Sequence, residues 1–439
     1  MMKIIIVGAV AGGATVASQI RRLDADADIT IYEKDRDMSY ANCGLPYYIG
    51  ETVASRDNIV MATPDTFNDN RNIQVHTYHE VTRLYPDDKK IEIYNHQTKE
   101  TFTDTYDYLI LSPGASQIVP DLYKHDHVFQ VRNLEDTDKI DQYIERTHAQ
   151  RALVVGGGYI SLEMAENLKH RGLDVTLVHR SSHFLKQMSR DITDTVPQVL
   201  EDNGIHLKLE DEVARINEHT VTFKSGDTDT FDIIITALGL QPNTKFIGDA
   251  LELNDKGYIK VNRYFETSNP SIYALGDAIE TFYRHIDKTA TIALAWGTHR
   301  AASIIAHNLF HKDREAFKGL LGSNILRLFD HTYASVGLTE ALVLEMDNIA
   351  HVSHTQKHKA SYMPYSSPLS ITVYYEQSTG KILSASASGK SGVDKRIDVL
   401  STAMIGGLTI YDFKDIEIAY HPDYSSPKDI INMLGYKAK

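Results

Sequence analysis

Residues 3–33, KIIIVGAVAGGATVASQIRRLDADADITIYE, decide the fold of this chain. An apolar strand leads into a turn that contains Gly8, Gly12 and Gly13, a helix follows, and a second apolar strand ends in Glu33. Glycines in such a turn let the backbone approach a pyrophosphate at the helix N-terminus, and an acid at the strand end binds ribose hydroxyls. The stretch therefore predicts a dinucleotide-binding βαβ unit.

Two features complicate this prediction. Val10 occupies the usual place of the second glycine, so the fingerprint is incomplete and a generic strand-turn-helix unit is the alternative. The basic start, apolar run and small residues of 1–17 are also typical of a secretion signal. A related pattern recurs over 152–180, where no signal peptide could lie, and this favours the βαβ interpretation.

The second unit keeps Gly156 and Gly158, whereas Ser161 replaces the third glycine and is small enough for close helix-strand packing. Its second strand ends in His179 and Arg180, where a site for NAD usually carries an acid. Cations at that position suit a 2′-phosphate, so the sequence predicts NADPH rather than NADH. A solvated His-Arg pair without a ligand is the alternative.

Composition excludes several classes of function. The 45 basic and 59 acidic side chains give a net charge of −14, so neither nucleic acid nor an anionic membrane is expected as the main partner. No apolar stretch beyond the first approaches the ~20 residues of a membrane span. The 20 histidines come without cysteine clusters or an HExxH motif, which predicts no metal site. A single cysteine excludes a disulfide scaffold and favours a cytoplasmic protein in a reducing compartment.

Three further segments resemble a known superfamily. Residues 108–115 and 231–243 each read as a buried strand ending in a glycine turn, and they resemble the strands that return the chain between the domains of two-dinucleotide flavoproteins. Residues 267–277, TSNPSIYALGD, resemble the second flavin motif of the FAD-dependent pyridine nucleotide-disulfide oxidoreductases. In that motif the aspartate, here Asp277, contacts the ribityl chain.

This resemblance implies an α/β fold with two Rossmann-like dinucleotide-binding domains, for FAD and NADPH, and a C-terminal α+β dimerisation domain. The FAD domain is expected over 1–115 and 250–320, the NADPH domain over 116–249 and the dimerisation domain over 321–439. The candidate cofactor contacts are Gly8, Ala9, Gly12, Gly13, Glu33, Lys34, Gly114, Gly156, Gly158, Tyr159, Ile160, His179, Arg180, Gly239, Gly276 and Asp277.

Cys43 is the only cysteine of the 439 residues and lies in the segment SYANCGLPY over 39–47. A lone cysteine is more often a small buried apolar residue than a nucleophile. An internal dithiol needs two cysteines within about 7 Å, and the C-x4-C pair of the superfamily's two-cysteine branch is absent. The segment resembles the active site of the single-cysteine branch, which includes NADH peroxidase, NADH oxidase and coenzyme A (CoA) disulfide reductase. Redox chemistry would then pair Cys43 with sulfur or oxygen of the substrate.

Several features favour CoA disulfide as the substrate. Thr15, Gln19 and Arg22 form a polar stripe on one helix face, although a plain solvated face would look the same. CoA carries a diphosphate and a 3′-phosphate, so it needs cations and hydroxyls in an otherwise acidic protein. Peroxidase and oxidase relatives usually carry a catalytic histidine in the first glycine loop, and residues 9–12 contain none.

The resemblance to the bacterial CoA disulfide reductases runs nearly end to end and includes 294–303 and 426–439. It implies a homodimer in which NADPH reduces CoA disulfide through FAD and Cys43, with a Cys43-CoA mixed disulfide as intermediate. Tyr362 and Tyr420 match tyrosines that the partner subunit projects toward the cysteine, although core packing is the alternative for both. A tyrosine, with a reference pKa near 10, suits protonation of the departing CoA thiolate. The implied substrate contacts are Thr15, Gln19, Arg22, Ser39, Asn42, Arg71, His299 and Lys428, and the family can carry lysine at the position of Arg71.

Two other functions stay open on sequence alone. Peroxide, oxygen or sulfane sulfur would replace CoA disulfide if Cys43 cycled through a sulfenate or a persulfide. Persulfide-reducing relatives often append a rhodanese domain with its own cysteine, which this sequence lacks. A flavin-dependent redox sensor with a structural Cys43 is the remaining class.

Overall fold

The computed structural model describes residues 2–284, 286 and 288–439. The chain forms two compact units. Unit 1 contains the chain up to Pro120 together with Gln130–Arg146 and Leu238–Leu320, and unit 2 contains Asp121–Phe129, Thr147–Ala237 and Leu321–Lys439. In the described part of the chain, every helix is too short or too polar to cross a bilayer.

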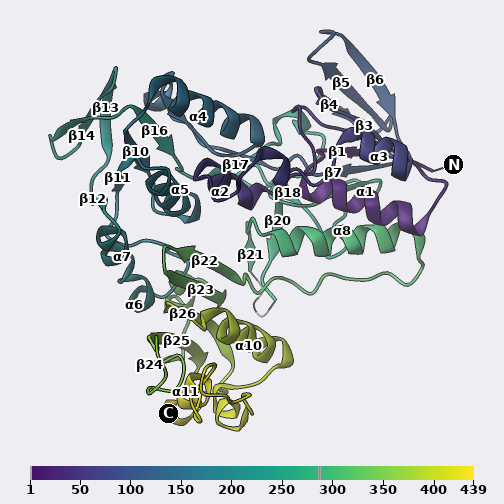
Figure 1. The fold of residues 1–439 in the computed structure, drawn as a ribbon. Helices are drawn as coiled ribbons and strands as arrows, with labels where there is room; N and C mark the ends of the chain where they lie inside the picture. The colour runs from purple at the N-terminus through teal and green to yellow at the C-terminus, as the bar shows by residue number, and fades with distance from the viewer. Residues whose placement is uncertain (1, 285, 287) are drawn as a thin grey trace. The chain divides into compact units, whose positions relative to one another are not determined.

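Unit 1 is built on a parallel five-stranded sheet in the order β19-β7-β1-β2-β3. Strands β1 and β7 at its centre consist mostly of isoleucine, leucine and valine because both faces of a parallel sheet are covered. Helices α1 and α8 run side by side along this sheet (Figure 1). The predicted strand-turn-helix-strand unit over 3–33 is present, with β1 over Lys3–Val7, α1 over Ala11–Leu23 and β2 over Asp28–Tyr32.

The other elements of unit 1 are η1 (Asn42–Gly44), α2 (Leu45–Ile49), η2 (Arg56–Asn58), α3 (Pro64–Arg71), β3 (Gln74–His76), β4 (His79–Tyr85), β5 (Lys90–Asn95), β6 (Thr101–Thr105), β7 (Tyr108–Leu111), β8 (Ala115–Gln117), α4 (Leu134–Thr147), β17 (Leu240–Pro242), η4 (Lys245–Ile247), β18 (Ile259–Lys260), β19 (Ile272–Ala274), β20 (Ile279–Phe282), β21 (Thr289–Ala290) and α8 (Ala295–Phe310).

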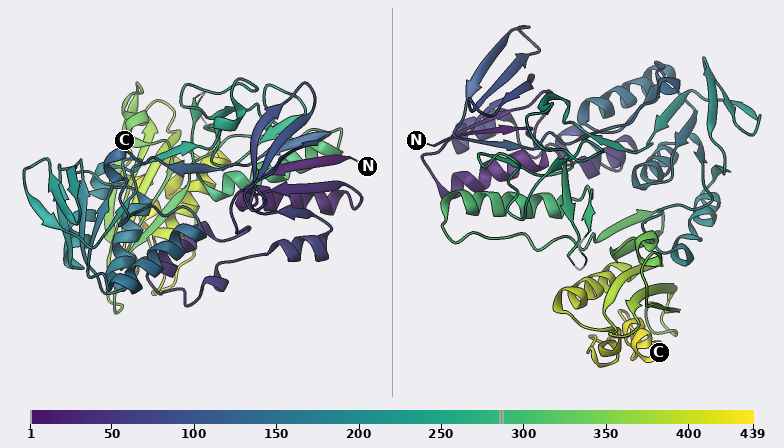
Figure 2. Two further views of the ribbon diagram at one scale, coloured as in Figure 1. Left: turned by 90° about the horizontal axis from the view of Figure 1, so that it is seen from above. Right: turned by 180° about the vertical axis from the view of Figure 1, so that it is seen from behind.

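Unit 2 contains a second parallel sheet, in the order β12-β11-β10-β16-β9, and an antiparallel sheet in the order β22-β23-β26-β25-β24. In the antiparallel sheet, the edge strand β24 mostly alternates between exposed and partly buried positions. Strand β26 is buried throughout, and α10 packs against it (Figure 2). The strands expected after residue 321 are therefore present, and they form the α+β part of the fold. The predicted α/β fold class, with two Rossmann-like sheets and a C-terminal α+β region, is confirmed.

The elements of unit 2 are η3 (Asp121–Tyr123), β9 (Val128–Phe129), β10 (Arg151–Val155), α5 (Tyr159–His170), β11 (Asp174–His179), α6 (Arg190–Thr193), α7 (Val196–Asp202), β12 (Ile205–Leu209), β13 (Val213–Asn217), β14 (Thr220–Phe223), β15 (Thr228–Thr230), β16 (Ile233–Thr236), β22 (Asn324–Leu328), β23 (His331–Gly337), α9 (Glu340–Leu344), β24 (Ile349–Lys357), β25 (Pro368–Glu376), β26 (Ile382–Gly389), α10 (Val393–Gly406), η5 (Ile410–Asp415) and α11 (Ile430–Lys437).

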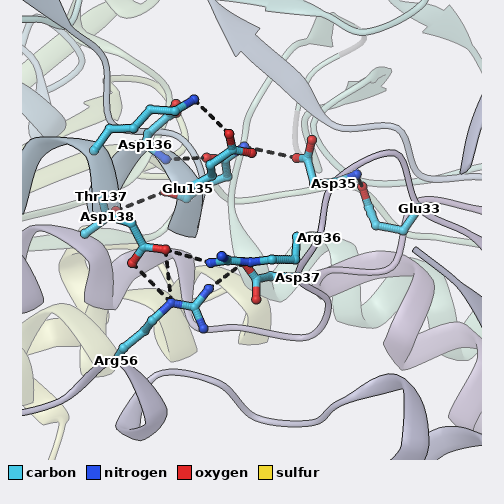
Figure 3. A network of polar contacts seen from close by, with 11 residues as sticks. Glu33, Asp35, Arg36, Asp37, Arg56, Glu135, Asp136, Thr137 and Asp138 are labelled. Carbon is cyan, nitrogen blue, oxygen red and sulfur yellow. Dashed lines mark hydrogen bonds and ion pairs between the residues drawn. The ribbon is translucent and has the colours of Figure 1, made fainter. Parts of the chain in front are cut away.

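Helix α4 belongs with unit 1, although the predicted NADPH domain of 116–249 would include it. Polar contacts anchor its N-terminal turns to the loop after β2 (Figure 3). Asn133 Nδ2 donates to Asp35 Oδ2 at 3.0 Å, and Arg36 Nη2 lies 2.7 Å from Asp138 Oδ2. The division into three domains stays a prediction, because the chain separates into two compact units whose bounds differ from those of the predicted domains.

Candidate active site

The turn between β1 and α1 leaves no room for side chains at its three glycines. Gly8 has φ +93°, and a Cβ there would lie 2.1 Å from the Ser112 carbonyl oxygen. A Cβ at Gly12 or Gly13 would also collide, with Ser112 Oγ and the Gly8 carbonyl oxygen respectively. Val10 has φ −91°, so the position of the usual second glycine does not need one here. Because no side chain caps α1, the N–H groups of its first turn stay available to a pyrophosphate.

Glu33 closes this nucleotide site at the end of β2. Its side chain is only 6% exposed, and it accepts hydrogen bonds from the backbone N–H of Ala9 (2.7 Å) and of Asp35 (3.0 Å). Burial raises the pKa of Glu33 from 4.5 to about 7, against the lowering effect of these two donors. Each carboxylate oxygen keeps a second acceptor site for a ribose hydroxyl. Lys34 follows as an exposed residue.

Asp277 lies at a second part of the same unit, beside a cavity of about 250 Å³ lined by Leu240, Tyr258, Asp277, Ile279, Thr291, Ile292 and Ala293. Its carboxylate forms an ion pair with Arg132, at 2.9 Å between Nη2 and Oδ2. The same guanidinium lies 3.3 Å from the place of a Cβ on Gly114. Gly276 and Gly239 adopt φ +84° and +119°, which a side chain would strain. The residues of unit 1 thus fit the flavin nucleotide that the sequence predicts.

Cys43 is exposed and lies in the single-turn helix η1, directly before α2. The loop that carries it pairs with the segment 59–61, because the Ala41 N–H donates to the Ile59 carbonyl at 2.8 Å and the Met61 N–H donates to the Ser39 carbonyl at 2.7 Å. A Cβ on Gly44 would lie 2.8 Å from Ile59 Cγ2, so these segments are closely packed. Asn42 Oδ1 is buried and has no hydrogen-bond partner among the described residues.

Helices α1 and α8 bring predicted substrate contacts together. Thr15 Oγ1 lies 3.1 Å from His299 Nδ1, and one turn further along both helices Gln19 Nε2 donates to Ser303 Oγ at 3.0 Å. Arg22 follows on α1 and is exposed. The polar stripe of α1 therefore runs along its contact with α8 and does not simply face solvent.

An arginine-lined cavity of about 480 Å³ continues from the end of this stripe, lined by Ser18, Arg21, Arg22, Asp69, Asn70, Arg71 and Asn72. Arg21 is structural, because its guanidinium donates to five backbone carbonyls, those of Asp24, Ala25, Ala27, Arg71 and Asn72. Arg71 donates to Ser18 Oγ at 2.6 Å and lies over the Phe67 ring. Two arginines, Arg22 and Arg71, are therefore placed to receive a phosphate group.

Unit 2 carries the second nucleotide cradle at the start of α5. Gly156 has φ +139°, and a Cβ there would lie 2.6 Å from the Ala237 carbonyl. A Cβ on Gly158 would meet nothing within 4 Å, so the space in front of the helix is open to a ligand. Ser161, the predicted substitute for the third glycine, is buried and donates to the Gly158 carbonyl at 2.8 Å. Tyr159 hydrogen-bonds Asn324 and is half-buried, as is Ile160.

His179 is not placed as a cation. Its ring stacks on Phe184, lies against Gly157 and hydrogen-bonds the His183 carbonyl. Burial lowers the pKa of His179, and the positive charges of Lys186 and Arg180 lower it further. A neutral ring is therefore favoured near pH 7, and the exposed cations at this strand end are Arg180 and Lys186.

Tyr362 and Tyr420 meet on the surface of unit 2. Their side chains are 74% and 50% exposed, so core packing does not explain them. A hydrogen bond from one hydroxyl to the other raises the pKa of Tyr420. Lys428 is also exposed in this unit, with its Nζ 5.4 Å from the centre of the Tyr436 ring.

Unit 1 thus contains Cys43 with its loop, the stripe of Thr15, Gln19 and His299, and the cavity with Arg22 and Arg71, whereas Tyr362, Tyr420 and Lys428 lie in unit 2. Sequence reasoning missed Ser18, Ser303, Arg132 and Lys186. Ser18 and Ser303 could have been found because they lie one helical turn from the predicted contacts Thr15 and His299. The sequence carried no signal for Arg132, because its partner Asp277 is 145 positions away.

Two family models match the chain. The model described as pyridine nucleotide-disulphide oxidoreductase matches residues 2–297, and that of the family's dimerisation domain matches residues 326–429. The chain therefore belongs to the pyridine nucleotide-disulphide oxidoreductase family, and it is an oxidoreductase. The family implies a flavin and a pyridine nucleotide as cofactors.

Among individual relatives, the coenzyme A disulfide reductase of Staphylococcus epidermidis is 51% identical over 441 residues, covering all of both chains. The crystal structure of a reduced CoADR-RHD from Bacillus anthracis is 38% identical with a TM-score of 0.97, covering 100% of this chain and 80% of that one. A water-forming NADPH oxidase engineered from the water-forming NADH oxidase of Lactobacillus brevis, bound to NADPH, is 27% identical with a TM-score of 0.94. The match covers 100% of this chain and 98% of that one. These comparisons confirm the resemblance to the CoA disulfide reductases.

Proposed function

We propose that the protein reduces CoA disulfide to two CoA thiols with electrons from NADPH, through bound FAD and the single cysteine Cys43. One observation carries this proposal. Unit 1 presents an exposed Cys43 together with a stripe of hydrogen-bonding groups on α1 and α8 and a cavity with two available arginines. The full-length identity to CoA disulfide reductases supports the same substrate.

The shape of this surface suits an elongated, phosphorylated disulfide. From Thr15 to Arg22 the helix rises about 10 Å at 1.5 Å per residue, which separates the arginines from the hydroxyl and imidazole groups. Arg22 and Arg71 would bind phosphate groups of CoA, and Thr15, Gln19 and His299 would bind its polar arm. Ser39 and Asn42 would contact the part nearest the sulfur. Lys428, an exposed cation, stays a predicted substrate contact.

A second line of support concerns NADPH. The engineered NADPH oxidase carries five substitutions: a glycine, then three consecutive residues that begin 18 positions later, then a residue 25 positions after the glycine. The same intervals counted from Ser161, at the third glycine position, reach His179, Arg180, Ser181 and Lys186. The engineered protein gained an arginine, a serine and an arginine at the places of the last three. Arg180 and Ser181 are identical to these, and Lys186 keeps the charge, which supports NADPH as the electron donor.

The chemistry of Cys43 follows from its being the only thiol of the chain. The Cys43 thiolate attacks one sulfur of CoA disulfide, the substrate S–S bond breaks, and a new S–S bond joins Cys43 to one CoA. The other CoA leaves as a thiolate and takes a proton, for which the hydroxyl of Tyr420 or Tyr362 is suited. FAD, held by the glycine turn before α1, Glu33 and Asp277, would supply two electrons taken from NADPH, and these would cleave the mixed disulfide. Cys43 is thereby restored as a thiolate, and the second CoA is released and protonated.

The tyrosines act across a homodimer interface in this proposal, and the match to the family's dimerisation domain supports that assembly. Mixed dimers provide a direct test. A dimer of one Cys43→Ser subunit and one Tyr362→Phe/Tyr420→Phe subunit contains one complete site if the tyrosines act on the partner's cysteine. We expect such mixed dimers to regain about half of the wild-type activity. Activity no higher than that of the two parent variants would show that tyrosine and cysteine act within one subunit.

The overall reaction is tested by stoichiometry. Purified holoenzyme with NADPH and CoA disulfide, without oxygen, should form two thiols for each NADPH oxidised. Cys43→Ser should form none and should still bind its flavin. Faster NADPH oxidation with hydrogen peroxide or oxygen than with CoA disulfide would contradict the proposal and favour a peroxidase or oxidase. A cytoplasmic location stays a prediction that rests on the single cysteine.

A further inference from the structure

The loop that carries Cys43 is flanked by a closed ring of four charged side chains (Figure 3). Arg36 Nη2 lies 2.7 Å from Asp138 Oδ2, and Arg36 Nε lies 3.2 Å from Asp37 Oδ2. Arg56 Nη2 lies 2.5 Å from Asp37 Oδ2, and Arg56 Nε lies 3.1 Å from Asp138 Oδ1. Each arginine therefore contacts both aspartates, and the charges of the ring balance.

The ring joins three segments of unit 1. Arg36 and Asp37 directly precede Met38 and Ser39, at the start of the cysteine loop. Arg56 begins η2, which directly precedes the segment 59–61 that pairs with that loop. Asp138 comes from α4, far away in sequence. Both aspartate side chains are 17% exposed, so they are better shielded from salt than an ordinary surface pair.

The backbone of the cysteine loop is strained at Ser39, and contacts around the loop must hold it in this conformation. Ser39, a proposed substrate contact, has φ +44°, a conformation that residues other than glycine adopt only where the surroundings fix it. The Ser39 N–H donates to the Ala9 carbonyl at 2.9 Å, and its own carbonyl accepts from Met61. The ring fixes the two chain segments at either side of these bonds. Isolated exposed ion pairs contribute little to stability, whereas several charges in a network can hold chain segments together. This ring holds the segments that flank the cysteine loop.

We infer that Asp138 is a positioning residue for Cys43. It acts through Arg36 and Arg56 to hold the cysteine loop in the geometry from which Cys43 attacks the substrate disulfide. This inference rests on the proposed function. Asp138 touches neither the sulfur nor the substrate in this account. Without its carboxylate, Arg36 and Arg56 lose their common partner, and the two segments around Cys43 can shift relative to each other.

The test measures the reaction of Cys43 itself. Holoenzyme is reduced with dithiothreitol, freed of it, mixed with CoA disulfide and quenched in acid at successive times, and the intact mass gives the rate of CoA loading. Asp138→Asn should slow loading about five-fold, the size of coupling expected within one ion-pair network. Arg56→Gln should slow it similarly, and the double variant less than the product of both, because the ring is already open. Asp138→Glu should recover most of the rate.

A matched control lies on the same helix. Glu135→Gln removes a carboxylate that is paired with Lys139 outside the ring, and it should load CoA at the wild-type rate. If Asp138→Asn does not fold, Arg36→Gln at the most exposed ring member provides the same test. Loading by Asp138→Asn at the wild-type rate, or equal slowing by Glu135→Gln, would overturn the inference. Failure of the wild type to load CoA would instead overturn the proposed function.

Discussion

Arg396 and Asp429 form a deeply buried ion pair in unit 2, with side chains 3% and 1% exposed. The guanidinium lies 2.5 Å from Asp429 Oδ2 and donates to the carbonyls of His358 and Tyr424 at 3.1 Å each. It thus ties α10 to the segment that carries Tyr420 and Lys428. Asp429 also caps α11 by accepting from the Ile431 N–H. Removal of the arginine should therefore destabilise this unit strongly.

The magnitude follows from what Arg396→Met leaves behind. A carboxylate stays buried without its counter-charge, which costs about 3–5 kcal/mol in comparable pairs. With a shift of about 2–4 °C per kcal/mol for a unit of this size, the midpoint of thermal unfolding should fall by about 6–20 °C. The double variant Arg396→Met/Asp429→Asn should regain part of the loss, because no charge stays buried and asparagine still caps the helix.

The assay is thermal unfolding followed by circular dichroism. Lys139→Met is the matched control, because it removes a cation from an exposed pair, which should cost no more than about 0.5 kcal/mol. A midpoint for Arg396→Met within 2 °C of this control, by the same scale of about 2–4 °C per kcal/mol, would refute the reasoning. A double variant less stable than Arg396→Met would show that the buried charge is not the cause of the loss.

Three further outcomes are expected. Gly8→Ala should unfold or lose flavin, because Gly8 has φ +93° and the new Cβ would lie 2.1 Å from a carbonyl oxygen. Gly158→Ala should keep the melting temperature, since its Cβ would meet open space, and should raise the KM for NADPH, since that space is proposed to hold the nucleotide. Equal losses of melting temperature in the two variants would contradict this expectation. The double variant Arg180→Gln/Lys186→Gln should raise the KM for NADPH at least about ten-fold through lost charged hydrogen bonds, and it should leave the KM for NADH unchanged. Steady-state kinetics with both nucleotides measure the two KM values. A parallel rise in the KM for NADH would argue against a 2′-phosphate site. The pKa of Glu33 lies above its unfolded value, so its contribution to stability is complete below pH 4.5 and is lost as the pH rises to about 7. Across that interval, urea unfolding of the apoprotein should show that the wild type loses about 3 kcal/mol of unfolding free energy relative to Glu33→Gln. If the unfolding free energies of the two proteins instead change in parallel with pH, Glu33 is ionised in the fold without cost.

Local patterns were enough to predict the framework of the site. Residues 3–33 form the expected unit because continuous apolar runs need burial on both faces and the glycines stand where no Cβ fits. Val10 shows why the incomplete fingerprint still folds, since the residue at the second glycine position has a negative φ. The stripe of Thr15 and Gln19 follows from helical spacing alone, whatever partner it meets.

Contacts between distant segments could not be predicted in the same way. The partners of Thr15 and Gln19 on α8 are 284 positions away, and no local period encodes that pairing. The ring around Asp138 needs three separate segments to meet. The sequence pattern indicated a cationic His179 because it carries no information on the packing of this ring against Gly157 and Phe184. This packing favours the neutral ring, so Arg180 is the cation at the end of the strand.

The measurement that tests the central claim most directly is the intact mass of the purified native protein before and after dithiothreitol, repeated with Cys43→Ser. The account predicts that CoA disulfide adds the mass of one CoA to the reduced protein, that dithiothreitol removes it, and that the serine variant gains none. An unmodified or merely oxygenated Cys43 that takes up no CoA from its disulfide would contradict the account and favour a peroxidase or oxidase.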